Sequence, residues 1–121
     1  MKIKATIVSE NCVFHLAGAV AEHGLSIFME TDCGNYLLDT GQGKAIVNNA
    51  LVLGIDLRTI KGIILSHHHW GHTGGLDPVL DLKGATFKFS KEVRQIEPGV
   101  WLTGEIPRRT DYVKSVTRHR L

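Results

Sequence analysis

The sequence has few cysteines and no long apolar run. It contains 2 cysteines, Cys12 and Cys33, in no C-x-x-C pattern, so we expect reduced thiols rather than a disulfide or a structural zinc site. No apolar stretch approaches the length of a transmembrane helix, and His15 interrupts the apolar segment near the N-terminus. We therefore expect a cytoplasmic protein with neither a membrane span nor a signal peptide.

The chain also lacks a strong charge of either sign. A net charge of +2 over 121 residues is too small to argue for a nucleic-acid partner. The basic tail at 108–121 leaves phosphate or nucleic-acid binding open as a minor alternative. A hydrophobic content of 43% is that of a globular chain, and the length suffices for a single core. We predict one domain over 1–107, followed by the tail.

Histidine, in contrast, is concentrated in one place. Four of the 7 histidines lie in the run H-H-H-W-G-H at 67–72, directly after the apolar segment 62–65, which predicts a buried strand. If the backbone stays extended past the strand, side chains alternate between its two sides, and His67 and His69 point the same way. A turn at Gly71 would then bring His72 to them. We predict that these three imidazoles meet at the carboxyl end of a central strand, where they could hold Zn, Fe, Mn or Ni.

One type of ligand is missing from this pattern. The position between Trp70 and His72, where a carboxylate would be expected, is Gly71. Three imidazoles without an anionic partner should hold a metal more weakly than a four-ligand structural zinc site does. We expect at most one metal ion per chain, and a chain that holds none stays an alternative.

Periodicity and turn residues predict the elements around the histidine run. We predict a helix over 43–53, a short helix over 76–82, a hairpin turn at 32–35, and strands at 3–8, 26–31, 36–39, 62–65, 86–89 and 100–103. This order indicates an α/β (α+β) fold, a mixed sheet with flanking helices.

Four stretches together resemble the metallo-β-lactamase superfamily, and within it the dihydropterin ribofuranosylaminobenzene phosphate synthase-like subgroup. They are E-H-G-L-S at 22–26, L-D-T-G at 38–41, the histidine run continued by T-G-G-L at 73–76, and P-G-V-W-L-T-G-E-I-P-R at 98–108. The resemblance extends from Ile3 to about Asp111.

This resemblance implies roles for particular residues. His67, His69 and His72 would be metal ligands, and Asp39 would orient them through hydrogen bonds. A substrate cleft would hold the side chains of His23, Glu105 and Arg108. From the residues alone, Asp39 could equally make an Asx turn with the Thr-Gly pair that follows it, and His23 could be an ordinary exposed loop histidine.

The departures from the family are also informative. Gly71 replaces the Asp of the family motif H-x-H-x-D-H. A family domain is about twice as long, a four-layer αββα sandwich, and the ligands of its second half have no counterpart here. We expect half of that sandwich, a sheet with helices on one face. Because the other apolar face would be left open, we expect a homodimer.

Two functions remain open at this point. A divergent metal-dependent hydrolase with an incomplete metal site would use one ion to activate water against an ester, amide or phosphoester. A catalytically inactive, truncated member of the family would serve as a metal-binding or assembly module. The histidine triplet favours the first and Gly71 the second, so the sequence alone does not decide whether the chain is an enzyme. It names no substrate.

Overall fold

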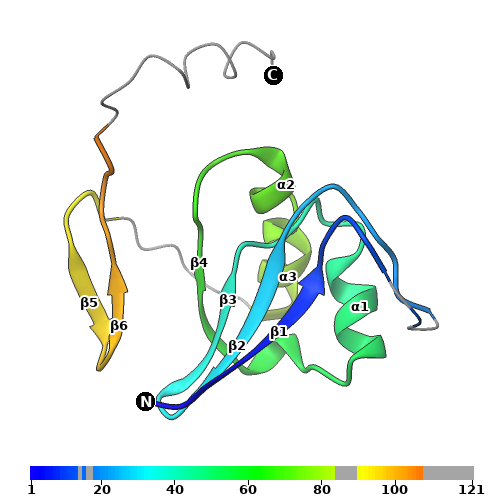
Figure 1. Cartoon of the computed structure of the whole chain (residues 1–121), viewed down its shortest axis with the longest axis horizontal. Helices are drawn as coiled ribbons and strands as arrows, with labels where there is room; N and C mark the ends of the chain where they lie inside the picture. The colour runs from blue at the N-terminus through cyan, green and yellow to red at the C-terminus, as the bar shows by residue number, and fades with distance from the viewer. Residues whose placement is uncertain (14, 16–17, 84–89, 108–121) are drawn as a thin grey trace. The chain divides into compact units, whose positions relative to one another are not determined.

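A computed structural model describes residues 1–13, 15, 18–83 and 90–107. Its elements, in chain order, are β1 (Ile3–Ser9), β2 (Ser26–Thr31), β3 (Gly34–Leu38), α1 (Ile46–Val52), the 3₁₀ turn η1 (Leu57–Thr59), β4 (Ile60–Ile64), α2 (Trp70–Thr73), α3 (Leu76–Lys83), β5 (Arg94–Glu97) and β6 (Val100–Leu102) (Figure 1). The chain divides into two compact units, Met1–Thr86 and Phe87–Leu121.

The first unit contains the predicted mixed sheet, with strand order β1-β2-β3-β4. β1 and β2 pair antiparallel, as do β2 and β3, whereas β3 and β4 pair parallel. A parallel neighbour requires a crossover connection, and α1 supplies it. Because parallel strands end at the same edge, the carboxyl ends of β3 and β4 lie next to one another. That edge carries the loops of the candidate site.

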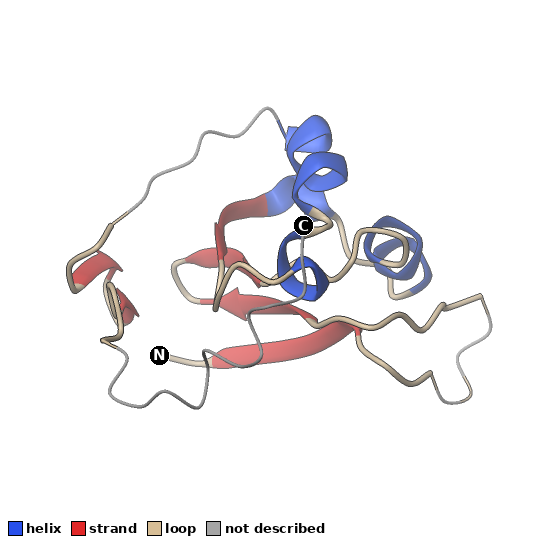
Figure 2. Ribbon diagram, turned by 90° about the horizontal axis from the view of Figure 1, so that it is seen from above, coloured by secondary structure: helices blue, strands red, loops and turns tan. Residues whose placement is uncertain are grey.

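One face of this sheet packs against the helices. Figure 2 shows the helices gathered on one side of the four strands. The buried core combines side chains from the sheet, from α1, from η1 and from α3: Val8, Phe28, Leu37, Ile46, Ala50, Leu57, Ile60 and Val79. Phe28 and Leu37 are direct cross-strand partners at its centre. The α/β fold class predicted from the sequence is therefore confirmed.

The opposite face of the sheet is only partly exposed. Strand alternation places Ile3 and Ile7 on the face turned away from the core, where they are 57% and 58% exposed. Tyr36 lies on the same face, in register with Met29 and Ala5, but is buried. The open apolar surface is thus concentrated on β1 and is narrower than the whole face that the sequence led us to expect.

Several elements of the first unit differ from the prediction, among them β4 and α1. β4 begins at Ile60 rather than Gly62 and, among the described strands, lies at an edge of its sheet instead of in the centre. Its Ile63 and Ile64 are accordingly half-buried. α1 begins at Ile46 instead of 43, because Gly41 and Gly43 adopt positive φ angles of 66° and 98° that keep the chain out of the helix.

The second unit contains a two-stranded antiparallel sheet of β5 and β6. β6 matches the strand expected at 100–103, but β5 was not predicted, since its sequence R-Q-I-E is mostly polar and its side chains are largely exposed. The strand expected at 86–89 and the basic tail at 108–121 lie outside the described residues. No helix in the described ranges is long and apolar enough to cross a bilayer.

A buried carboxylate ties the loop before β2 to the start of α1. Glu22 accepts hydrogen bonds from Ser9 Oγ (2.9 Å) and from the backbone nitrogens of Gln42 (2.9 Å), Lys44 (3.0 Å) and Ala45 (3.1 Å). The last two donors belong to the start of α1, where backbone N–H groups lack partners within the helix and the dipole favours an anion. Glu22 therefore fixes the helix start and the adjoining loop together.

We predict that Glu22→Ala lowers the free energy of unfolding by about 3 kcal/mol or more, because it leaves buried N–H donors without an acceptor. Urea unfolding of the full chain measures this loss. Glu30→Ala is the matched control, since Glu30 pairs with Lys4 in a largely exposed salt bridge (2.7 Å), and its loss should cost at most about 1 kcal/mol. Equal losses in both variants would contradict a structural role of Glu22.

Candidate functional site

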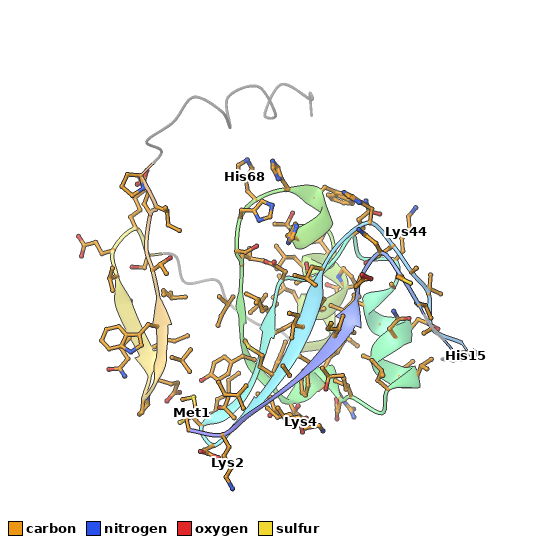
Figure 3. The ribbon with its side chains drawn as sticks, viewed as in Figure 1. Met1, Lys2, Lys4, His15, Lys44 and His68 are labelled. Atoms are coloured by element: carbon orange, nitrogen blue, oxygen red, sulfur yellow. The ribbon has the colours of Figure 1, made fainter. Side chains whose placement is uncertain are left out.

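Three histidine rings meet in the loop that follows β4. The ring centroids of His67 and His72 are 4.0 Å apart, and those of His67 and His69 are 4.7 Å apart. Figure 3 shows His68 at the outer end of the same loop, and its ring centroid is 5.4 Å from that of His69. The structure therefore brings together the three imidazoles that the sequence grouped.

Asp39 holds this loop from the end of β3. Its side chain is 1% exposed, and its Oδ1 accepts a hydrogen bond from Ser66 N (2.7 Å). Its Oδ2 accepts from Ser66 Oγ (2.6 Å) and lies 2.7 Å from His72 Nδ1. Asp39 also has a positive φ of 56°, a conformation that is uncommon outside glycine and is often found at functional sites. The expected contact between Asp39 and the histidine loop is present.

These contacts fix where two of the imidazoles carry their proton. An ionised carboxylate only accepts hydrogen bonds, so His72 must donate from Nδ1 and Ser66 must donate its hydroxyl hydrogen to Asp39. Ser66 Oγ lies 2.9 Å from His67 Nδ1 and has no second hydrogen, so His67 must be the donor of that bond. When neutral, both rings then keep a free lone pair on Nε2, the form in which an imidazole binds a metal or accepts a proton.

The charge state of His67 agrees with this assignment. Burial of part of the ring lowers the pKa of His67 below its usual value, the proximity of the His72 and His69 rings lowers it further because adjacent imidazolium charges repel one another, and Asp39 opposes the shift. A lowered pKa favours the neutral ring at neutral pH. His67 is thus kept in the state that a ligand or a base requires.

Close backbone contacts lock the loops of the site to one another. Thr40 donates to His72 O from both its nitrogen (2.8 Å) and its hydroxyl (2.9 Å), and Leu25 N donates to Gly71 O (3.1 Å). A Cβ atom on Gly24 would clash with Gly71 O, and one on Gly75 would clash with Thr40 O. Glycine at these two positions lets three loops approach closely enough to hold the histidines in place.

A pocket of about 440 Å³ opens beside the cluster. It is lined by the residues after β1, by the loop before β2, by Gln42 and by the histidine loop: Glu10, Asn11, His23, Gly24, Leu25, Gln42, His69, Trp70, Gly71 and His72. His23, which the resemblance assigned to a cleft, shares this pocket with His69 and His72. The volume lies within the range of small-molecule sites.

The other two residues assigned to the cleft stay predictions. Glu105 belongs to the second unit, where its side chain is exposed and its backbone nitrogen donates to Lys91 O (2.9 Å). Arg108 lies outside the described residues. Two residues of the site were not predicted from the sequence, Ser66 and Glu10. The hydroxyl of Ser66, between the strand and the first histidine, was a weak signal. Glu10 gives no signal, because it is far from the histidine run in the sequence.

The donor chemistry of the cluster suits one metal ion, although the side chains do not form a closed site. In the part of the chain that the structure describes, no group of three or more His, Cys, Asp or Glu side chains is arranged to hold a metal. Neutral imidazoles with Nε2 available, oriented by a buried carboxylate, are nevertheless the donors that zinc-class ions prefer. Gly71 adds no side chain, so nothing at that position supports a second ion.

The mixed sheet, its one-sided helices and the loop anchored by Asp39 form part of a metallo-beta-lactamase fold. Residues 20–107 match the sequence profile of the metallo-beta-lactamase superfamily, and the chain belongs to that family. It is 34% identical over 79 residues to the 7,8-dihydropterin-6-methyl-4-(beta-D-ribofuranosyl)-aminobenzene-5'-phosphate synthase of Methanocaldococcus jannaschii. It is 33% identical over 52 residues to the hydroxyacylglutathione hydrolase of Shewanella pealeana.

The match extends over only part of each known protein. The chain spans 27% of the synthase and 19% of the hydrolase, with 61% and 43% of its own residues aligned. The crystal structure of Tm1679, a metal-dependent hydrolase of the beta-lactamase superfamily, superposes with a TM-score of 0.62 and 21% identity over 83% of this chain and 47% of that protein. This likeness concerns the fold.

We predict that Ser66→Ala changes the tautomer of His67 alone, whereas Asp39→Asn disturbs His67 and His72 together. Ring ¹⁵N chemical shifts of the metal-free chain report which nitrogen carries the proton. Zinc affinity, measured by competition with a chelator, should fall about 10- to 100-fold in Asp39→Asn. Ser90→Ala removes a hydroxyl that hydrogen-bonds with the backbone of Glu92 in the second unit, and it should leave these signals unchanged. Protons on Nε2 of His67 and His72 in the wild type would contradict the assignment.

Proposed function

We propose that this chain is a divergent metal-dependent hydrolase-like protein with an incomplete metal site. His67, His69 and His72 would hold one ion, zinc or else Fe, Mn or Ni. The observation that carries the proposal is the hydrogen bonding of Asp39, which orients His72 directly and His67 through Ser66. A buried carboxylate that orders two imidazoles in this way is a common support of metal ligands.

The pocket gives this site a place for a substrate. When bound, a zinc-class ion lowers the pKa of a water molecule and polarises a carbonyl or phosphoryl group. His69 and His72 belong both to the histidine cluster and to the pocket wall. His23 lines the same pocket and is exposed, so its ring is placed to exchange a proton with a bound ligand. A volume of about 440 Å³ favours a small molecule over a macromolecule as the substrate.

A second candidate function is a non-catalytic module that binds a metal or supports assembly. Gly71 favours it, because the pair of ions that clamps attacking and leaving oxygens needs further anionic ligands. The open arrangement of the histidine side chains in the described residues favours the assembly role of this candidate over its metal-binding role. The two candidates differ in whether the chain with a bound ion hydrolyses a substrate.

We predict at most one zinc-class ion per chain, readily removed by a chelator. Elemental analysis after dialysis, with the wild type and single variants, measures the stoichiometry. His67→Ala and His69→Ala should abolish binding, whereas His68→Ala is the matched control because its ring lies at the outer end of the loop. Two tightly held ions per chain, or unchanged binding in His69→Ala, would contradict the proposal.

The same proteins test activity. We expect negligible hydrolysis of β-lactams and weak or no phosphoesterase activity, and Gly71→Asp should raise metal occupancy more than turnover. A Cβ atom at position 71 would lie 3.0 Å from His23 O, so the loop has to shift by a few tenths of an ångström to admit the new side chain. Fast metal-dependent hydrolysis by the wild type that disappears in His69→Ala would refute the incomplete site and establish an enzyme.

We also propose that the chain forms a homodimer through the exposed face of β1. Met1, Ile3 and Ile7 present apolar side chains there that are each more than half exposed. Covering apolar surface contributes about 25 cal/mol per Å², which favours pairing with a second copy of the same face.

Sedimentation of the full chain at low micromolar concentration tests this assembly. We expect a dimer for the wild type and a monomer for Ile7→Lys, which places a charge on the proposed interface. Leu51→Lys alters an equally apolar, exposed residue on α1 and should leave the dimer intact. A stable wild-type monomer that binds no hydrophobic dye would contradict the proposal.

A further inference from the structure

One edge of the first sheet is open along β1. Figure 1 shows β4, β3, β2 and β1 side by side in that order, and among the described strands β1 pairs only with β2. In the described part of the chain, no backbone group of residues 3–7 forms a hydrogen bond outside that pairing. Asn49 of α1 closes the edge further on, because its side chain donates to Val8 O (2.8 Å). Residues 3–7 therefore present free backbone N–H and C=O groups on the side away from β2.

This edge lacks the features that usually prevent a second strand from pairing with it. Proline, a bulge or a lysine commonly protects the edge of a sheet. Residues 3–7 contain no proline, and their register with β2 becomes irregular only after Ile7. Their one charged residue, Lys4, lies directly opposite Glu30 and pairs with it (2.7 Å), so its ammonium group is held within its own sheet. The edge is thus suited to strand addition.

A second copy of β1 fits this edge in a particular register. When two antiparallel residues face each other, both direct their backbone groups toward the other strand or both direct them away. In a symmetric pair the two-fold axis must therefore pass through a residue, which faces its own copy. An axis at Ala5 pairs all of residues 3–7, with Ile3 opposite Ile7 and Lys4 opposite Thr6.

The neighbouring registers are less favourable. An axis at Lys4 would set two lysines directly opposite each other, and like charges in that arrangement destabilise a sheet. An axis at Thr6 would set Ile3 opposite Ser9, beyond the irregularity and beside the stretch that Asn49 closes. An axis at Ala5 instead brings together the isoleucines that are 57% and 58% exposed, and it leaves a small side chain at the centre.

We infer that β1 pairs antiparallel with β1 of a second copy around Ala5, so that two four-stranded sheets join into one continuous sheet. The inference rests on the proposed homodimer and specifies its contact, and it does not depend on the metal site. The pairing satisfies the open backbone groups of both strands. It also covers part of Ile3 and Ile7, because each packs against the other across the two strands.

Disulfide trapping tests the register. In a chain with Cys12→Ser and Cys33→Ser, Ala5→Cys should cross-link to its own copy under mild oxidation, because facing Cα atoms in antiparallel strands are about 4.5–5.5 Å apart. Ile7→Cys is the matched control, since its two copies would lie about 13 Å apart along the strands and should not cross-link. A mixture of Ile3→Cys and Ile7→Cys chains should cross-link, because these two positions face each other.

Amide hydrogen exchange of the full chain is a second measurement that needs no cysteine. Alternate amides of residues 3–7, those that point away from β2, should exchange slowly in the dimer. Their protection should be lost in Ile7→Lys, whereas the amide of Phe28, which lies between β1 and β3, should stay protected in both proteins. Circular dichroism shows whether each variant is folded.

The outcomes separate the strand pairing from the homodimer itself. Cross-linking at Ala5 and in the mixture of Ile3 and Ile7 variants, with none in Ile7→Cys alone, would support the inference. A sedimenting dimer whose folded Ala5→Cys variant cross-links no faster than Ile7→Cys, or whose outward amides on β1 exchange freely, would overturn the strand pairing alone. A wild-type monomer at low micromolar concentration would overturn both.

Discussion

The hydrogen bonds of the Asp39 carboxylate are the interaction on which the candidate site depends. Its backbone nitrogen donates to Ile64 O (2.8 Å), which joins the end of β3 to the end of β4, and its side chain holds Ser66 and His72. A buried charge is costly unless it is fully hydrogen-bonded, so the histidine loop cannot leave Asp39 without a large penalty. The same hydrogen bonds determine which ring nitrogen of His67 and of His72 faces a hydrogen-bond partner and carries a proton. One carboxylate thus determines both the path of the loop and the chemistry of its rings.

A second buried carboxylate has a different task. Glu22 accepts hydrogen bonds from the start of α1 and from Ser9, and so positions the loop that carries His23 and Gly24. Gly24 then allows that loop to approach Gly71 more closely than any other residue would. Asp39 orders the imidazoles, and Glu22 orders the pocket wall opposite them. Neither contact depends on a bound metal.

Much of this arrangement follows from the sequence. Period-2 patterns locate β2 at 26–31 and β1 to within one residue, and alternation past β4 groups His67 with His69. His72 joins them from the helix α2 instead of from the turn predicted at Gly71. Other features depend on contacts between distant residues and leave no local signal. The donor role of His67 arises only because Ser66 has already given its hydrogen to Asp39, and Glu10 reaches the pocket from the far end of β1. β5 lacks apolar alternation, so no pattern marks it as a strand.

X-ray absorption spectroscopy at the zinc edge of the zinc-loaded chain identifies the ligand atoms, and so shows whether the histidines that Asp39 orients hold the ion. We expect one ion with imidazole nitrogens at about 2.0–2.1 Å and the multiple-scattering pattern of histidine rings, with no sulfur in the coordination shell. A sulfur ligand at about 2.3 Å, which would implicate Cys12 or Cys33, would contradict it, as would a spectrum of zinc coordinated by water alone.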